Sequence, residues 1–151
     1  MGQIGCARGS AENVNPEELV VLAERIATES HEGQFRRGGV IPYIEHPRAV
    51  ASRVRGDAEA EAVAWLHDVI EDCEHTEESL TQAGIPIRCV EAIVLLTKTR
   101  ETAYEDYLGK IEASPLATKV KIADMLSNLA DNPTKKQIEK YAKGLLRLIR
   151  K

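Results

Sequence analysis

The stretch AEAEAVAWLHDVIED, residues 58–72, decides the fold that we expect. Four of its apolar residues recur at the i, i+3, i+4, i+7 spacing of a helix face that packs on a core. These residues are Ala62, Trp65, Leu66 and Val69. His67, Asp68 and Glu71 then project from the other side, with Asp72 at its edge. The spacing predicts one buried helix over the whole stretch, with a polar group facing a cleft at its C-terminal end.

The rest of the chain predicts further helices and no strand, because no segment shows sustained period-2 alternation. We expect these helices over residues 16–31, 46–55, 77–84, 86–97, 103–113, 115–132 and 134–149, with a loop over residues 33–44. Asn15 is placed to cap the first helix. Thr76 caps the helix over residues 77–84, with Glu78 near the capping-box position.

One helix carries a stripe that is expected to face the core. Within residues 115–132 this stripe consists of Leu116, Val120, Ala123, Leu126 and Ala130. The chain shows no internal repeat and no linker. We therefore predict a single all-α domain over residues 15–151, a bundle of about seven to eight helices, preceded by a disordered lead-in over residues 1–14.

Length and composition restrict the classes of protein to consider. The 151 residues suffice for one domain with a substantial core. No apolar run approaches the roughly 18 residues that span a bilayer, and the N-terminus lacks the apolar block of a signal peptide. Cys6, Cys73 and Cys89 show no paired spacing, so neither a disulfide framework nor a zinc knuckle is predicted. We expect a cytoplasmic protein without a membrane partner.

The charged residues are distributed unevenly along the chain. The net charge of −4 argues against a nucleic-acid partner. Residues 56–78 contain nine acidic residues and no Lys or Arg, whereas Lys and Arg dominate from Lys119 onward. An acidic centre facing basic flanks suits a metal that holds a phosphorylated small molecule. Solvated helix faces explain most of the individual charges equally well.

Four residues form a candidate metal site. The His67–Asp68 doublet supplies an imidazole and a carboxylate to one point, and His46 and Asp124 from other helices can complete a mixed nitrogen/oxygen site. Such a set suits Mn²⁺, Fe²⁺ or Co²⁺, with Zn²⁺ as a further alternative. A lone His–Asp dipeptide is usually an ordinary surface or capping pair. Four ligand-type residues on three predicted helices, each amid core positions, favour the metal site.

Two acidic residues follow the doublet within one helical turn. Glu71 and Asp72 lie where a metal-bound water would need a base. Because they are adjacent and both acidic, they could share this role, since like charges at short range raise one pKa. The pattern therefore predicts a metal-dependent hydrolase.

These residues resemble the His…His-Asp…Asp signature of the HD phosphohydrolase superfamily. The similarity is closest to the hydrolase domain of RelA/SpoT alarmone enzymes and to the stand-alone small alarmone hydrolases. The segments that carry it are HEGQFRR (31–37) leading to PYIEHP (42–47), LHDVIED (66–72) and KVKIADMLSNL (119–129). The resemblance spans about residues 19–131, in the order of the family.

The resemblance implies an all-helical HD fold that binds one Mn²⁺, with Fe²⁺, Co²⁺ or Zn²⁺ as alternatives. The implied ligands are His46, His67, Asp68 and Asp124. Glu71 and Asp72 match the pair that positions and activates the attacking water. Asn128 matches an asparagine near the ribose and phosphate, and Arg36 a basic residue near the purine base. In the family, a metal-bound water removes the 3′-pyrophosphate of guanosine tetra- or pentaphosphate.

The sequence predicts the type of reaction, a metal-dependent hydrolysis, more specifically than it predicts the substrate. Basic residues near the cleft would offset charge on a phosphate, and the candidates are Arg36, Arg37, Lys119 and Lys121. For Lys119 and Lys121, a surface role is an equal expectation. Cys73 stands where the alarmone enzymes usually carry threonine, and residues 96–115 resemble short HD proteins of unassigned substrate.

Two alternatives therefore stay open. One is a phosphohydrolase of another nucleotide, such as a nucleoside monophosphate or a dinucleotide phosphate. The other is a non-catalytic HD module that binds a nucleotide or a partner protein. In each enzymatic interpretation the expected partner is a small phosphorylated nucleotide, and the sequence leaves the oligomeric state open.

Overall fold

A computed structural model describes residues 14–150, which fold into nine helices. They are α2 (Pro16–Ser30), α3 (Glu45–Ser52), α4 (Ala58–Leu66), α5 (Val69–Asp72), α6 (Glu77–Gln82), α7 (Ile87–Leu96), α8 (Tyr104–Glu112), α9 (Pro115–Leu129) and α10 (Lys135–Ile149). Over residues 14–150 the only β-type pairing is an isolated bridge between Phe35 and Pro42. The all-α prediction is confirmed. The predicted lead-in lies outside the described residues except for its last position.

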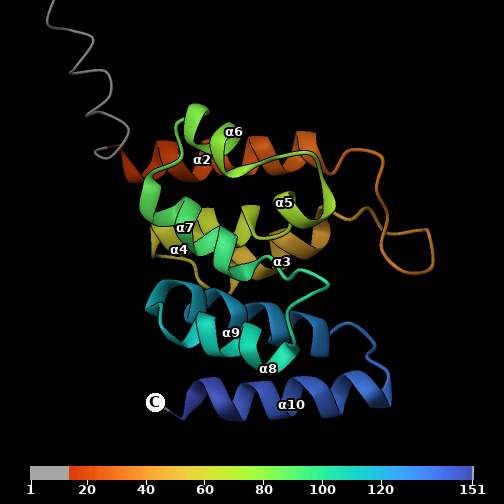
Figure 1. Cartoon of the computed structure of the whole chain (residues 1–151). Coiled ribbons are helices and arrows are strands. Elements are labelled where there is room, and N and C mark those ends of the chain that lie inside the picture. Colours follow the sequence, from red (N-terminus) through yellow and green to blue (C-terminus); the bar gives the residue numbers. More distant parts are fainter. Residues whose placement is uncertain (1–13, 151) are drawn as a thin grey trace, which may run out of the picture.

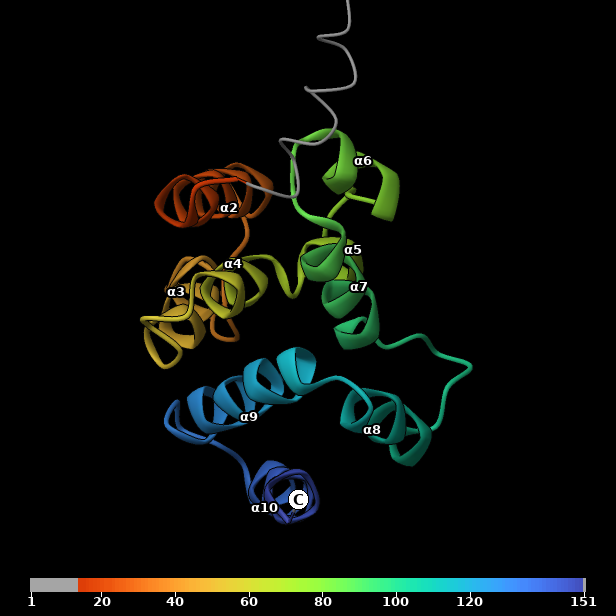
Figure 2. The ribbon, with the colours of Figure 1, turned by 90° about the vertical axis from the view of Figure 1, so that its left-hand side faces the viewer.

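The helices are stacked in layers around a central helix, α4 (Figure 1). α2 and α6 lie at one end of the stack, α3, α4, α5 and α7 form the middle, α8 and α9 follow, and α10 closes the other end (Figures 1 and 2). α4 packs against α2, α3, α7 and α9. Because it has neighbours on several sides, its last five residues, Ala62 to Leu66, are all buried. None of the helices in residues 14–150 is long and apolar enough to cross a membrane.

Side-chain caps begin several of the helices. The Asn15 side chain accepts hydrogen bonds from the backbone N–H groups of Glu17 and Glu18, as expected for the first helix. Thr76 caps α6 as predicted, but its capping-box partner is Ser79 and not Glu78. Ser79 occupies the third helical position, from which its hydroxyl reaches the Thr76 N–H at 2.9 Å.

The predicted helix over residues 58–72 is divided, and this corrects the sequence prediction. α4 ends at Leu66, and α5 begins only at Val69, so His67 and Asp68 form a corner between two helices. In a continuous helix, adjacent residues do not face one another. The corner changes the direction of the chain and lets both side chains reach one point. Tertiary contacts at that point therefore override the local helical preference.

The buried face of α9 also differs from the predicted stripe. Val120 and Ala123 are buried as expected, but Leu126 is 40% exposed and Ala130 is exposed. The helix is rotated so that Asp124 and Ser127 are buried instead. Ser127 accepts a hydrogen bond from Arg53 Nε at 2.9 Å, and Asp124 contacts two histidines. Buried partners for polar residues set this face, and hydrophobicity alone does not reveal them.

Candidate metal centre

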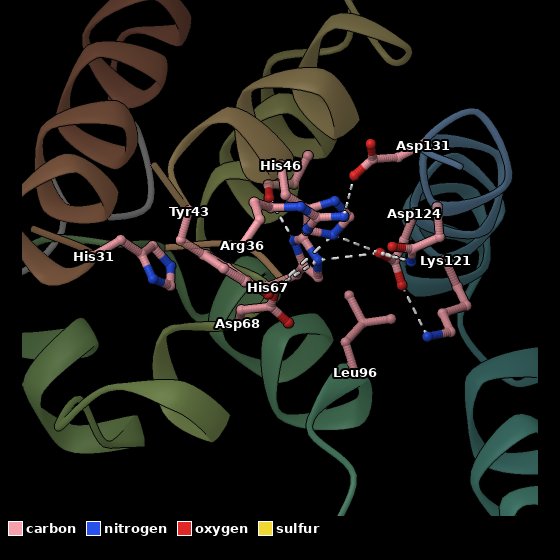
Figure 3. A network of polar contacts seen from close by, with 12 residues as sticks. His31, Arg36, Tyr43, His46, His67, Asp68, Leu96, Lys121, Asp124 and Asp131 are labelled. Carbon is pink, nitrogen blue, oxygen red and sulfur yellow. Dashed lines mark hydrogen bonds and ion pairs between the residues drawn. The ribbon is translucent and has the colours of Figure 1, made fainter. Parts of the chain in front are cut away.

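The four predicted ligands come together at one point between α3, the α4–α5 corner and α9 (Figure 3). His46 Nε2 lies 2.9 Å from Asp124 Oδ1 and 3.9 Å from Asp68 Oδ2. His67 Nε2 lies 3.2 Å from Asp68 Oδ2 and 3.4 Å from Asp124 Oδ1. His46, His67 and Asp124 are buried. Two imidazole nitrogens and two carboxylates thus converge from three separate parts of the chain.

The donor set fits a divalent cation. His67 Nδ1 lies 2.7 Å from the Ala64 carbonyl oxygen, which can only accept, so in the neutral ring Nδ1 carries the proton and Nε2 presents a lone pair. This Nε2 is buried and makes no well-formed hydrogen bond within residues 14–150, although the carboxylate oxygens of Asp68 and Asp124 lie near it. One ligand atom from each of His46, His67 and Asp124 lies within 4.8 Å of the others. Lone pairs that face one another in a buried site are the arrangement that a bound metal satisfies.

Charges around the cluster keep both carboxylates ionised. Burial raises the pKa of Asp68, but the positive charge of the His67 ring, when that ring is protonated, outweighs burial and lowers the pKa of Asp68 to about 2. Burial also opposes ionisation of Asp124, yet the Lys121 ammonium outweighs it and holds the pKa of Asp124 well below its usual range. Lys121 Nζ lies 2.9 Å from Asp124 Oδ2. Ionised carboxylates are the form that binds a metal.

A tyrosine that the sequence reasoning missed supports Asp68. Tyr43 donates its hydroxyl to Asp68 Oδ2 at 2.6 Å. Burial raises the pKa of Tyr43 above its ordinary value, so the hydroxyl keeps its proton and remains a donor. The Tyr43 ring packs on the His31 ring at 4.8 Å and lies edge-on to the His46 ring at 5.9 Å. The only sequence signal was its position three residues before a ligand.

The contacts of Tyr43 continue into a short hydrogen-bond chain. His31 Nδ1 and Gln34 Oε1 are 2.8 Å apart, and Gln34 Nε2 donates to the backbone oxygen of Asp72 at 3.2 Å. The loop over residues 31–44 is therefore tied both to the predicted metal ligand Asp68 and to the end of α5.

The two residues of the predicted acidic pair differ in the hollows that they line: Glu71 lines two, and Asp72 lines only one of these. Glu71 lines the same pocket as the metal cluster, and its Oε1 accepts the Lys98 backbone N–H at 2.9 Å. Burial raises the pKa of Glu71, and the charges of Asp68 and Asp72 raise it further. Asp72 lines the adjacent hollow with Cys73. Of the two, only Glu71 lines the pocket that contains the four predicted metal ligands.

The predicted polar substrate contacts reach the pocket unequally. Arg36, Lys121 and Asn128 line the metal pocket, whereas Arg37 lines a neighbouring hollow. Asn128 Nδ2 donates to Asp124 Oδ1 at 3.2 Å. Arg36 is paired with a carboxylate of its own, since its guanidinium lies 2.7 Å from Asp131 Oδ2.

Lys119 is not brought to the pocket. Its ammonium pairs with Asp57 Oδ2 at 2.8 Å, on an exposed surface. Lys121, Asp124 and Asn128 are three and four residues apart on α9 and share one face, but Lys119 lies five residues from Asp124 and faces elsewhere. The structure therefore separates the two lysines that the sequence treated alike.

The pocket has a second wall that the sequence did not assign. Besides the metal cluster and the residues of the loop, Leu96, Lys98, Tyr104, Tyr107, Lys140 and Tyr141 line it. The pocket volume is about 250 Å³, and the neighbouring hollow of about 410 Å³ shares Arg36, Tyr43 and Asn128 with it. Sites for small molecules span roughly 300–1,000 Å³. The two hollows together therefore suit a ligand of nucleotide size.

Proteins of known name match this chain over part of their length. No family model matches. The guanosine-3′,5′-bis(diphosphate) 3′-pyrophosphohydrolase of Haemophilus influenzae is 41% identical over 112 residues, which cover 70% of this chain and 16% of that protein. A probable enzyme of the same name from Synechocystis is 32% identical over 135 residues, 81% of this chain and 18% of that protein. The chain thus spans less than a fifth of the length of these relatives.

Shared sequence and a shared fold decide the family. A solved structure of a metazoan ortholog of SpoT that hydrolyzes ppGpp aligns with 91% of this chain and 88% of its own, at a TM-score of 0.74 and 22% identity. The chain is an HD-domain protein of the RelA/SpoT type. At 22% identity the structural likeness establishes the fold of this RelA/SpoT-type chain, and the predicted HD-type helical fold is confirmed.

Proposed function

We propose that this chain is a metal-dependent phosphohydrolase that removes the 3′-pyrophosphate of guanosine 3′,5′-bis(diphosphate) or its pentaphosphate analogue. The observation that carries the proposal is the convergence of His46, His67, Asp68 and Asp124, with the buried lone pair of His67 Nε2 among carboxylate oxygens. The names of the matching relatives support the substrate.

The proposed metal is Mn²⁺, held by His46, His67, Asp68 and Asp124. This set has nitrogen and oxygen donors and no thiolate, which suits Mn²⁺, with Fe²⁺, Co²⁺ and Zn²⁺ as alternatives. Such an ion, when bound, polarises a phosphoryl oxygen and lowers the pKa of a coordinated water. Tyr43 holds Asp68 and Lys121 holds Asp124, so both carboxylates are fixed in place before a ligand enters.

Glu71 is the proposed general base. The backbone N–H of Lys98 donates to Glu71 Oε1 and holds the carboxylate in place. In this position the Glu71 carboxylate would accept a proton from the attacking water. Its raised pKa makes it a stronger base than an ordinary glutamate. Asp72 acts through Glu71, since its negative charge contributes to that raised pKa.

The substrate is proposed to extend from the metal towards the loop over residues 31–44. Asn128 lies beside Asp124, where a ribose or phosphate oxygen would come within reach. Arg36 and Arg37 line the neighbouring hollow, whose volume of about 410 Å³ leaves room for a purine base. The Arg36 guanidinium also lies over the Tyr43 ring, 5.6 Å from its centroid. Tyr43 therefore contacts both the residue proposed to bind the base and the proposed metal ligand Asp68. Lys119 has no part in this proposal.

The test is the release of pyrophosphate and phosphate from a panel of nucleotides with Mn²⁺, with Mg²⁺ or with chelator. We expect pyrophosphate from guanosine 3′,5′-bis(diphosphate) with a divalent ion and none with chelator. The absence of turnover of any nucleotide with any metal would contradict the enzyme proposal. Turnover only of nucleotides without a 3′-pyrophosphate would reject the alarmone substrate and retain the hydrolase.

A further inference from the structure

The wall of the pocket opposite the loop carries cations without carboxylate partners. Lys98 follows α7, Tyr104 begins α8 and Lys140 lies on α10, and all three line the metal pocket. We call these three residues the α8–α10 wall. In Figure 2, α8 and α10 lie on neighbouring sides of α9, which carries Asp124. The wall therefore lies next to the metal ligands but contributes none of them.

The two lysines of this wall differ from the other cations of the pocket. Arg36 and Lys121 each pair with a carboxylate. Within residues 14–150, Lys98 Nζ contacts only the Thr99 carbonyl oxygen, at 3.3 Å, and Lys140 Nζ lies over the rings of Tyr104 and Tyr141, at 4.7 and 5.5 Å from their centroids. Neither forms an ion pair with a carboxylate in that part of the chain. Their charges are therefore available to an anion.

The lysines also lie close enough to affect one another. Burial lowers the pKa of Lys140, and the charges of Lys121 and Lys98 lower it further. Positive charges that lie close together in a pocket repel one another. An anion that binds among them removes this repulsion, so such a pocket favours anion binding.

Tyr104 adds a hydrogen-bond donor to the same wall. Its hydroxyl is buried and has no hydrogen-bond partner within residues 14–150, which is energetically unfavourable for a polar group. Gly144 on α10 lets this hydroxyl and the Met125 side chain approach the helix closely, because a Cβ there would lie 3.4 Å from the hydroxyl and 3.0 Å from the Met125 sulfur. An oxygen-rich ligand group would relieve the unsatisfied donor.

We propose that Lys98, Tyr104 and Lys140 form a second phosphate subsite, which binds a phosphate or diphosphate group of the substrate other than the one that reacts. Ammonium and hydroxyl donors are suited to phosphate oxygens. The subsite would select nucleotides that are phosphorylated at two positions. Its role in selection rests on the proposed function, since that function places the reacting phosphate at the metal ligands.

The first test measures binding without turnover. Inorganic pyrophosphate is titrated into the protein by calorimetry with chelator present, so that neither metal nor catalysis contributes. We expect the affinity to fall about tenfold or more in Lys140→Met and about fivefold in Tyr104→Phe. Lys143→Met removes the same charge from an exposed position on the same helix and should leave the affinity unchanged. Equal affinity in wild type and Lys140→Met, or no binding by wild type, overturns the subsite.

The second test compares two substrates with the same 3′-pyrophosphate. For guanosine 3′,5′-bis(diphosphate), Lys140→Met should raise KM about tenfold with kcat retained, and for guanosine 3′-diphosphate KM should not change. An equal rise for both substrates overturns the subsite. If wild type hydrolyses neither substrate, the proposed function fails, while the binding experiment still decides whether the subsite exists.

Discussion

The two walls of the pocket differ in how their polar groups are paired. On the loop side, Tyr43 donates to Asp68, Gln34 donates to the Asp72 backbone and Arg36 pairs with Asp131. On the other side, Lys98 and Lys140 face the pocket without carboxylate partners in residues 14–150. The comparison teaches that the polar groups of one wall are paired within the protein and hold the proposed metal ligand Asp68, whereas the lysines of the other wall are left for the proposed phosphate ligand.

The backbone of the loop explains why its wall is fixed. Arg36 N–H donates to the Ile41 oxygen and Tyr43 N–H to the Gln34 oxygen, each at 2.8 Å. Gly38 and Gly39 turn the chain between them at φ values of 100° and 75°, a left-handed region that favours glycine. The loop therefore presents Tyr43 to Asp68 from a closed hairpin-like turn and not from a free segment.

The largest expected effect is a loss of kcat on substitution of Glu71, which lines the pocket of the proposed metal ligands. Glu71→Gln should lower kcat by about 10²–10⁴-fold, because the amide cannot accept the proton of the attacking water. Mn²⁺ affinity should remain within about threefold, since Glu71 lies outside the four proposed ligands. Steady-state kinetics and metal titration measure the two quantities. Glu74→Gln, at an exposed position, is the matched control, and an unchanged kcat in Glu71→Gln removes this residue from the mechanism.

A second prediction separates the two lysines of α9. Lys121→Met should lower the free energy of unfolding by about 3 kcal/mol, because it leaves the buried Asp124 carboxylate without its cation. Lys119→Met should lower it by less than about 1 kcal/mol, because its pair with Asp57 is exposed. Urea denaturation with chelator present measures both. Equal losses in the two variants would contradict the assignment of Lys121 to the site.

A third prediction concerns the fixed wall. Tyr43→Phe removes the hydrogen bond to Asp68 but keeps the ring that packs on His31. We expect Mn²⁺ affinity to fall about tenfold, as for other partners that orient metal ligands. Tyr141→Phe, on the opposite side of the pocket, is the control. A Tyr43→Phe protein with wild-type affinity would show that the loop does not position Asp68.

The smallest expected effect is a loss of stability on breaking the partly exposed ion pair between Arg36 and Asp131. Asp131→Asn breaks the ion pair with Arg36, whose partner carboxylate is half exposed. The free energy of unfolding should change by less than about 1 kcal/mol. Thermal denaturation, compared with the Tyr43→Phe protein, measures this change. A loss of several kcal/mol would mean that the ion pair, and not the backbone turn, holds the loop.

Much of this arrangement could be predicted from local sequence, because helix periodicity and ligand chemistry are local properties. The convergence of His46, His67, Asp68 and Asp124 could be expected, because His and Asp in core positions need a partner. The break in the helix at His67 and Asp68 could not be predicted, because no Gly or Pro marks it. Contacts with the distant residues Asp124 and His46 explain it. Tyr43 escaped notice for the same reason: its role depends on a carboxylate 25 residues away.

The two walls differ in what the sequence can reveal of them. A helical wheel of α9 would have separated Lys119 from Lys121, because only the latter shares a face with Asp124. The α8–α10 wall combines residues from three elements, and the pairing of each lysine depends on the tertiary fold. No local pattern therefore distinguishes Lys140 at the pocket from Lys143 on the exposed side of the same helix.

Direct titration of Mn²⁺ into the wild-type protein and Asp68→Ala, followed by electron paramagnetic resonance, tests the central claim most directly. The account predicts one Mn²⁺ bound per wild-type chain and no measurable binding to an Asp68→Ala protein that remains folded. Wild-type protein that binds no Mn²⁺, or Asp68→Ala protein that binds it as well as wild type, would contradict the metal centre.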